Sequence, residues 1–305
     1  MIYGYIKLII VTLIWGGNYH VVKYLVSEAD IFTVGFLRFI ISSSLLLFFY
    51  FRKNRRAGLQ NKLEQHWKIL FAIGLIGVFL YNMLFFGASQ LISANRVAIF
   101  YAFTPAITVL LGVIFLRQYV NFWGYLGIFV ALLGTVGVII VSINGVNVSG
   151  ATNSITQLLL GQILAILAAL AMAIYNILNQ KALQHGLDSL TITTFGAVFA
   201  TLFLFVAFLI FGKTGLSGLA NKTWLFWVAM IYLSVFATVL CYKWYSDSIY
   251  EIGVGKAVVF QNGVPLSAVL IGILLLGEQM LFGVLISGVI IIIGVLITNL
   301  TLTSR

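Results

Sequence analysis

Amide and phenol side chains recur inside long apolar segments of the sequence, where polar groups are costly and usually face a cavity or a partner helix. Asn18 and Tyr19 lie in the first apolar segment, and Tyr175 and Asn176 lie at the matching positions of the sixth. Such groups bind small polar molecules through hydrogen bonds and aromatic contacts. The pattern predicts that two helices line one substrate site from opposite sides, with hydrogen bonding between helices as the alternative.

Two prolines, Pro105 and Pro265, lie in the middle of the fourth and ninth apolar segments. Proline lacks an N–H, so each frees the carbonyl four residues earlier, at Tyr101 and Gln261. Polar side chains at those two positions, together with Asn262, predict a substrate-binding cradle at a kinked helix. We therefore expect the prolines to act in gating, with a purely structural kink as the alternative.

The third and eighth segments add further polar side chains to the predicted substrate-binding set: Tyr81, Asn82, Tyr242 and Trp244. Lys243 and Asp247 are four residues apart, so they share a helix face and can form an ion pair. Histidine is the side chain whose unperturbed charge changes near neutral pH, and the first segment contains one, His20. These three residues are the candidates for proton or charge coupling, with an interfacial ion pair and a hydrogen-bonded structural histidine as the alternatives.

Two further cations, Lys23 and Arg38, lie in the first two apolar segments. We expect both to lie toward the outer end, near Glu28 and Asp30, through snorkelling or pairing.

Catalytic chemistry has no support in the sequence. It contains no HExxH, no Walker loop and no GxSxG motif, and its one cysteine, Cys241, rules out a cysteine metal site. We therefore predict that the protein is not an enzyme and that it has no catalytic residue, no metal ligand and no cofactor.

The composition excludes a soluble protein. Hydrophobic residues make up 62% of the 305 residues, charged residues only 8%, and the mean hydropathy is +1.13. A soluble domain has about 25% charged residues. A chain with so little charge belongs in a membrane.

Ten apolar segments are long enough to span a membrane as helices, which needs about 20 residues each. Segments that are apolar on every face exclude a strand barrel, which alternates polar and apolar residues. The sequence thus predicts an all-α polytopic membrane protein with ten transmembrane helices, at residues 4–26, 31–51, 69–90, 95–116, 120–143, 158–182, 189–211, 224–246, 253–276 and 280–302.

The basic residues predict the orientation. Six of the seventeen lie in the connection Arg52–Lys68, and Lys and Arg concentrate on the cytoplasmic side of membrane proteins. We expect a multi-pass protein of the inner (plasma) membrane with both termini in the cytoplasm. The uncharged stretch 144–157 then forms an extracytoplasmic linker.

The two halves of the chain resemble each other. A shift of 160 positions places Phe100 on Phe260 and Pro105 on Pro265 without gaps. We predict two five-helix repeats, at residues 1–143 and 158–305. Since five is odd, the second repeat is inverted, which is typical of secondary transporters.

Several motifs resemble the EamA-type repeat of the drug/metabolite transporter superfamily. They are LIWGGNYHVVKYLV in the first segment, FLRF at Phe36–Phe39, Phe260–Pro265 and GEQ at Gly277–Gln279. The resemblance implies a ten-helix inner-membrane carrier that moves amino acids, related metabolites or drugs, often outward. Arg117 replaces a turn carboxylate that is common in this family. The first helix also lacks the glutamate that couples protons in small four-helix relatives, which argues against simple carboxylate-driven antiport.

The combined prediction is a secondary transporter that moves small polar or amphipathic metabolites, amino acids or related compounds, by alternating access. The alternative is a multidrug exporter of aromatic or cationic compounds. The expected partners are a small-molecule substrate and membrane lipid, without nucleic acid, and the chain is expected to act as a monomer or weak homodimer.

Overall fold

The computed structural model describes residues 2–53, 60–117, 121–149, 155–215, 217–277 and 282–300. Within these ranges every regular element is a helix. Eight helical stretches are long and apolar enough to cross a membrane, and two shorter apolar helices cover Phe122–Gly137 and Phe282–Gly294. The predicted all-α polytopic fold is therefore confirmed, and each predicted segment coincides with a helical stretch.

The first half of the chain contains five helical stretches, two of them composite. They are α1 (Ile2–Glu28), α2 (Ile31–Lys53), α3 (Gln60–Ala72) continued by the π-helix η1 (Ile73–Leu80) and α4 (Tyr81–Leu91), α5 (Ala94–Tyr101) followed by α6 (Thr104–Leu116), and α7 (Phe122–Ser149).

The second half repeats this order. Its elements are α8 (Ile155–Gln184), α9 (Ser189–Phe211), the short η2 (Ser217–Leu219), α10 (Trp224–Ile231) continued by the π-helix η3 (Tyr232–Leu240) and α11 (Cys241–Ile252), α12 (Val254–Val259) with the 3₁₀ turn η4 (Phe260–Asn262) and α13 (Gly263–Leu276), and α14 (Phe282–Leu300).

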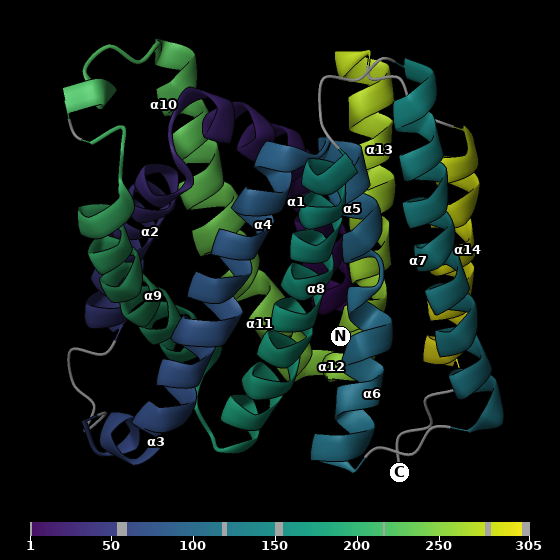
Figure 1. The fold of residues 1–305 in the computed structure, drawn as a ribbon. Coiled ribbons are helices and arrows are strands. Elements are labelled where there is room, and N and C mark those ends of the chain that lie inside the picture. The colour runs from purple at the N-terminus through teal and green to yellow at the C-terminus, as the bar shows by residue number, and fades with distance from the viewer. Residues whose placement is uncertain are drawn as a thin grey trace.

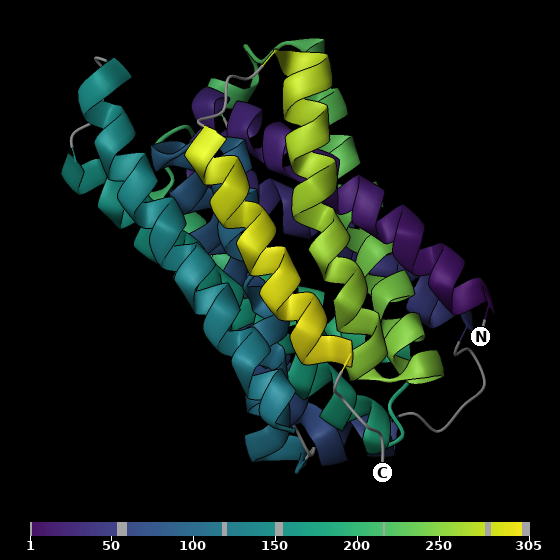
Figure 2. The same cartoon turned by 90° about the vertical axis from the view of Figure 1, so that its right-hand side faces the viewer.

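Helices from the two halves pack against each other throughout the bundle. The most extensive contacts join α7 to α14, α2 to α9, α4 to α8 and α1 to α13. The paired helices α7 and α14 form one flank, and α2 and α9 lie at the other (Figures 1 and 2). Large apolar side chains such as Phe129, Leu209 and Leu274 are exposed on the outside, as a lipid-facing surface requires.

Irregular segments occupy matching places in the two halves. The π-helices η1 and η3 interrupt the third and eighth helical stretches, and π-helical turns are frequent at functional sites. The regular α-helix of the fourth and ninth stretches is interrupted, at Ala102–Phe103 and at the 3₁₀ turn η4, and we call these two interruptions the helix breaks. The backbone of Ala102 and Phe103 remains in the right-handed helical region. The helix breaks lie where a proline kink is expected, and Pro105 and Pro265 both fall in the first turn of the helix that follows, where the missing N–H costs nothing.

The predicted linker 144–157 is shorter in the structure. Helix α7 continues to Ser149 and α8 begins at Ile155, so only residues 150–154 lie outside the described helices. Once a helix is formed, each added residue gains a backbone hydrogen bond, which explains this extension into a polar stretch.

Cysteines introduced at the two ends of the bundle should be accessible from opposite sides of the membrane. The lower end in Figure 1 carries α3, and the upper end carries η2 and α10. Cys241 is the single cysteine of the sequence and is buried, and its replacement by alanine leaves a background without thiols. In this Cys241→Ala background we expect Lys53→Cys at the lower end to react with a membrane-impermeant maleimide only from the cytoplasm. Lys213→Cys at the upper end should react only from outside. Labelling of both cysteines from one side would contradict the predicted orientation.

Candidate functional site

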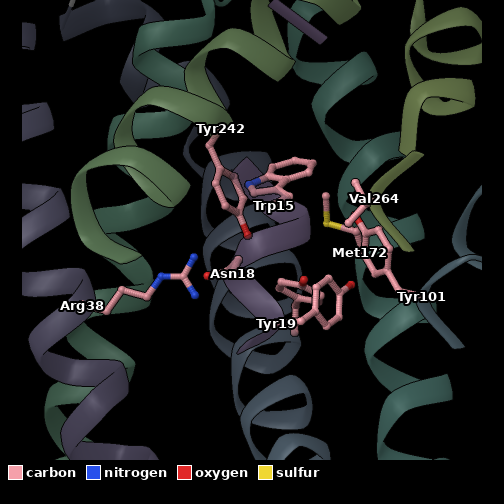
Figure 3. Close-up of a pocket in the computed structure, with 9 residues that line it drawn as sticks. Trp15, Asn18, Tyr19, Arg38, Tyr101, Met172, Tyr242 and Val264 are labelled. Carbon is pink, nitrogen blue, oxygen red and sulfur yellow. The ribbon is translucent and has the colours of Figure 1, made fainter. Parts of the chain in front are cut away.

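A small central cavity lies between the two halves. Its free volume is about 10 Å³, which leaves room for about one water molecule in this closed conformation. Its walls come from α1, α2, α4 and α5 of the first half and α8, α11 and α13 of the second (Figure 3), through Trp15, Asn18, Tyr19, Arg38, Tyr81, Tyr101, Met172, Tyr242 and Val264.

Helix α1 presents one face to this cavity. Trp15, Asn18 and Tyr19 are spaced by three and four residues, so they share that face. The Trp15 indole donates to the carbonyl of Ala237 at 3.0 Å, which fixes the ring. The Asn18 side chain is only 5% exposed, and its Oδ1 has no hydrogen-bond partner. A buried amide oxygen without a partner is the arrangement expected of a group that meets a ligand.

Aromatic rings form most of the remaining wall. Tyr19 lies edge-on to Tyr101 with 6.1 Å between ring centroids, and Trp15 lies edge-on to Tyr242 at 5.6 Å. Tyr242 in turn contacts Tyr175 at 5.5 Å. Such rings offer flat apolar surfaces and phenol hydroxyls to a bound molecule.

Arg38 is not at the outer end, as its sequence position suggested, but inside the bundle and 1% exposed. Its Nε donates to Thr238 Oγ1 at 2.8 Å, and one terminal nitrogen donates to Asn82 Oδ1 at 2.7 Å. Arg38 lies about 10 Å along α2 from its first residue, too deep for its side chain to reach the interface. The expectation of snorkelling is therefore wrong for this residue.

A second polar cluster joins the two helix breaks. Asn176 donates from Nδ2 to Thr108 Oγ1 at 3.1 Å and to Gln261 Oε1 at 3.3 Å, and accepts at Oδ1 from the Tyr245 hydroxyl at 3.1 Å. Asn176 is fully buried. The Asn176 cluster, made of these four residues, thus connects α8 to the broken fourth and ninth stretches.

Ionised side chains gather at the lower end. Lys243 pairs with Asp247 at 2.6 Å, the ion pair that their spacing indicated, and Lys7 lies 3.1 Å from Glu251 and 3.6 Å from Asp247. A wider cavity of about 320 Å³ opens beside this group, between the end of α2, the connection from α8 to α9, and α11. The Lys7–Glu251 pair connects the two halves of the chain.

The upper end is also tied across the halves. Lys222 contacts the carbonyl oxygen of Glu28 and lies 3.3 Å from its carboxylate. Partial burial raises the pKa of Asp30, but hydrogen bonds from Thr33 and Thr214 outweigh it and hold that pKa below its ordinary value. Lys23 donates to the carbonyls of Ser89 and Ile92 at the end of α4.

The predicted binding residues fall into three groups. Asn18, Tyr19, Tyr81, Tyr101 and Tyr242 line the central cavity. The second group lies next to the cavity without lining it. Asn82 accepts a hydrogen bond from Arg38, Tyr175 packs against the ring of Tyr242, and Asn176 donates a hydrogen bond to Gln261. The third group is Trp244 and Asn262: Trp244 does not line the cavity and is partly exposed on α11, and the side chain of Asn262 lies outside the described residues.

The predicted gating and coupling residues lie away from the central cavity. Pro265 borders a small apolar space between α5, α13 and α14, and Pro105 is buried at the start of α6. The His20 ring donates from Nε2 to the carbonyl of Ala268 at 2.8 Å, on the neighbouring α13.

Sequence reasoning missed Arg38 and three other cavity residues, Trp15, Met172 and Val264. For Arg38 a signal existed: a lone arginine in the FLRF segment, with no acid near it in α2. The other three are apolar residues in apolar helices, which no pattern separates from lipid-facing neighbours.

Comparisons with known proteins agree on one kind of protein. A profile of the "EamA-like transporter family" matches residues 2–140 and 159–300. An "Uncharacterized transporter YetK" of Bacillus subtilis (strain 168) is 27% identical over 276 residues, 90% of this chain and 80% of the relative. An "Uncharacterized transporter YyaM" of the same organism is 27% identical over 272 residues, 88% of this chain and 84% of the relative.

A solved structure shares the fold. Titled "Crystal structure of protein", it matches with a TM-score of 0.67 at 13% sequence identity, covering 97% of this chain and 96% of its own.

Proposed function

The chain belongs to the EamA-like transporter family, and on that premise we propose that it is a secondary carrier for small polar or amphipathic metabolites, amino acids or related compounds. It moves them by alternating access between its two halves. The observation that carries this proposal is the central cavity, whose walls come from both halves and combine aromatic rings, a free amide oxygen and a cation.

Closure of both ends supports alternating access. Cross-half contacts hold the lower end through Lys7 and Glu251 and the upper end through Lys222 and Glu28. The central space is too small for a metabolite, so binding requires the halves to separate at one end. Opening the two ends in turn would expose the same cavity first to one side of the membrane and then to the other.

The helix breaks supply the hinges for this motion. Short irregular segments absorb large changes in backbone angles, and the breaks before Pro105 and Pro265 lie next to the Asn176 cluster. That position supports a gating role for both prolines.

The candidates for proton or charge coupling are the three residues named from the sequence, His20, Lys243 and Asp247. Asp247 and Lys243 belong to the ion pairs at the lower end, so a proton gradient acting on them would change how that end opens. His20 donates a hydrogen bond to a carbonyl of α13, so a gradient acting on it would change the contact between α1 and α13. The first helix offers no acid before Glu28, which favours exchange without an ion.

The aromatic walls favour a second candidate in part, a multidrug exporter of aromatic compounds. The buried cation Arg38 disfavours cationic drugs, because a like charge in the same closed space is repelled. One chain contains the whole cavity, so we propose that a monomer in the plasma membrane is sufficient for transport.

Counterflow in proteoliposomes tests the carrier. Vesicles loaded with a mixture of the twenty unlabelled amino acids should accumulate labelled amino acids from outside, saturably and without an ion gradient. Val264→Phe on α13 fills the cavity and should lower the initial rate at least about tenfold, because the closed space has no room for the added ring atoms.

Leu270→Phe is the matched control, since this residue is on the same helix and 56% exposed on the outside. Its rate should equal that of the wild type, and both variants should elute as folded protein. Flux that rises linearly with concentration would indicate a channel. Equal rates in Val264→Phe and the wild type would remove the cavity from the pathway.

A further inference from the structure

Arg38 is a buried cation, and its partners among the described residues are all neutral. Its guanidinium donates to Thr238 and Asn82 and lies 5.2 Å from the ring centroid of Phe39 and 5.9 Å from that of Phe86. Arginine keeps its charge throughout the physiological pH range. A charge buried without a counter-ion is costly, so an anion that entered the cavity would be stabilised.

The acidic side chains that the structure describes do not supply that anion. The carboxylates that the structure describes are engaged at the two ends of the bundle, Glu28 with Lys222, Asp188 with Lys53, Asp247 with Lys243, Glu251 with Lys7, and Asp30 at the start of α2. None of these described carboxylates pairs with Arg38. Among the described residues the charge of Arg38 is therefore left without a counter-ion.

The fold itself does not require a cation at this place. Helix α9 occupies the position in the second half that α2 occupies in the first, and the two pack against each other. Between Ser189 and Phe211 the sequence of α9 contains no charged residue. A helix in this role is thus stable in the bundle without an arginine.

The two neutral partners fix the direction of the guanidinium. Thr238 donates its own hydroxyl to the carbonyl of Leu233 at 2.8 Å, and Asn82 donates its amide to the carbonyl of Val78 at 2.6 Å. Each therefore turns an oxygen toward Arg38. The second terminal nitrogen has no acceptor among the described residues, and the group points into the cavity toward Asn18 and Tyr242 (Figure 3).

We propose that Arg38 binds the carboxylate of the transported substrate, and that this substrate is a small organic acid with a flat apolar body. The planar guanidinium fork fits a carboxylate. The free Oδ1 of Asn18 accepts a hydrogen bond from a donor beside that carboxylate, such as an ammonium or hydroxyl group, and the aromatic rings enclose the apolar body. This inference rests on the proposed carrier function and names its substrate class.

Three probes with one ring and different charges test the proposal on the purified full-length protein. Phenylacetate carries only a carboxylate, phenethylamine only an ammonium group, and L-phenylalanine both. We expect phenylacetate and L-phenylalanine to raise the Tm saturably, L-phenylalanine at the lower concentration because its ammonium group also reaches Asn18. Phenethylamine should leave the Tm unchanged.

Arg38→Gln should weaken binding of both carboxylate probes at least about tenfold, because a charge-assisted hydrogen bond is lost. Arg38→Lys keeps the charge without the fork and should bind them with intermediate affinity. Lys181→Gln, which removes a cation from the far part of α8 where it lies over Phe115, should bind like the wild type. Each variant's Tm without probe reports whether it is folded.

Three results would overturn the assignment. The first is an equal rise in the Tm of the wild type with phenethylamine and with phenylacetate. The second is unchanged binding of the carboxylate probes by folded Arg38→Gln. The third is counterflow of amino acids by a protein whose Tm does not respond to any carboxylate probe. The opposite combination, carboxylate binding that depends on Arg38 without counterflow of any probe, would retain the site and refute the carrier function instead.

Discussion

Alanine at Gly16 is expected to reduce transport at least about tenfold and to lower the Tm of the purified protein. A Cβ atom at this position would lie 2.4 Å from Ser267 Cβ and 3.0 Å from the backbone nitrogen of Ala268. Backbone atoms cannot yield as a flexible side chain can, so α1 must move away from α13. Overpacking of this kind costs about 1–3 kcal/mol, and it displaces Trp15 and Asn18 from the cavity.

The measurement is counterflow together with thermal unfolding in detergent. Gly288→Ala is the control, because a Cβ there would make ordinary contacts at 3.5 Å with Ile99. It should have wild-type transport and stability. A Gly16→Ala protein that transports at the wild-type rate would show that the close crossing of α1 and α13 does not determine the geometry of the cavity.

Leucine at Asn176 is expected to have the second large effect. The substitution removes the common partner of Thr108, Gln261 and Tyr245 in a fully buried place. Thr108 keeps its hydrogen bond to the carbonyl of Thr104, whereas the Gln261 amide oxygen and the Tyr245 hydroxyl become unsatisfied. Each unsatisfied buried group costs about 1–3 kcal/mol, so the Tm should fall, and transport should fall with it because the cluster connects both helix breaks. Thermal unfolding and counterflow measure the two effects.

A double-mutant cycle with Gln261→Leu separates the cluster from its parts. The two single substitutions should be strongly non-additive, because the double variant removes both ends of one hydrogen bond. Thr135→Val on α7 is the control, since its hydroxyl bonds only to its own helix, at Ala131, and its loss should change the Tm and the transport rate little. Additive effects of Asn176→Leu and Gln261→Leu would mean that the cluster does not act as a unit.

The two halves are not equivalent at the cavity. The first half supplies the cation Arg38 and the free amide of Asn18, whereas the second half supplies Tyr242 and the apolar Met172 and Val264. A duplicated fold thus surrounds a site whose chemistry is one-sided. That asymmetry allows one orientation of a polar substrate to be preferred during transport.

The amino-acid sequence alone determined the fold class and the order of the helices. A helix that crosses a membrane must satisfy its backbone internally and be apolar over about 20 residues, and both properties are local. The same local reasoning indicated that the fourth and ninth stretches are kinked near Pro105 and Pro265. It also placed Asn18, Tyr19, Tyr81, Tyr101 and Tyr242 among the candidate residues, because polar groups inside apolar segments are conspicuous.

Only the tertiary structure decided which of these groups meet. It separated Trp244 from the cavity, joined Gln261 to Asn176, and placed Arg38 in the interior rather than at the outer end. In a soluble protein, the apolar stripe of a helix marks the face that packs inward. In a membrane the lipid is as apolar as the protein core, so the sequence of a helix does not say which face is buried. Contacts between helices distant in the chain had to decide that for Trp15, Met172 and Val264.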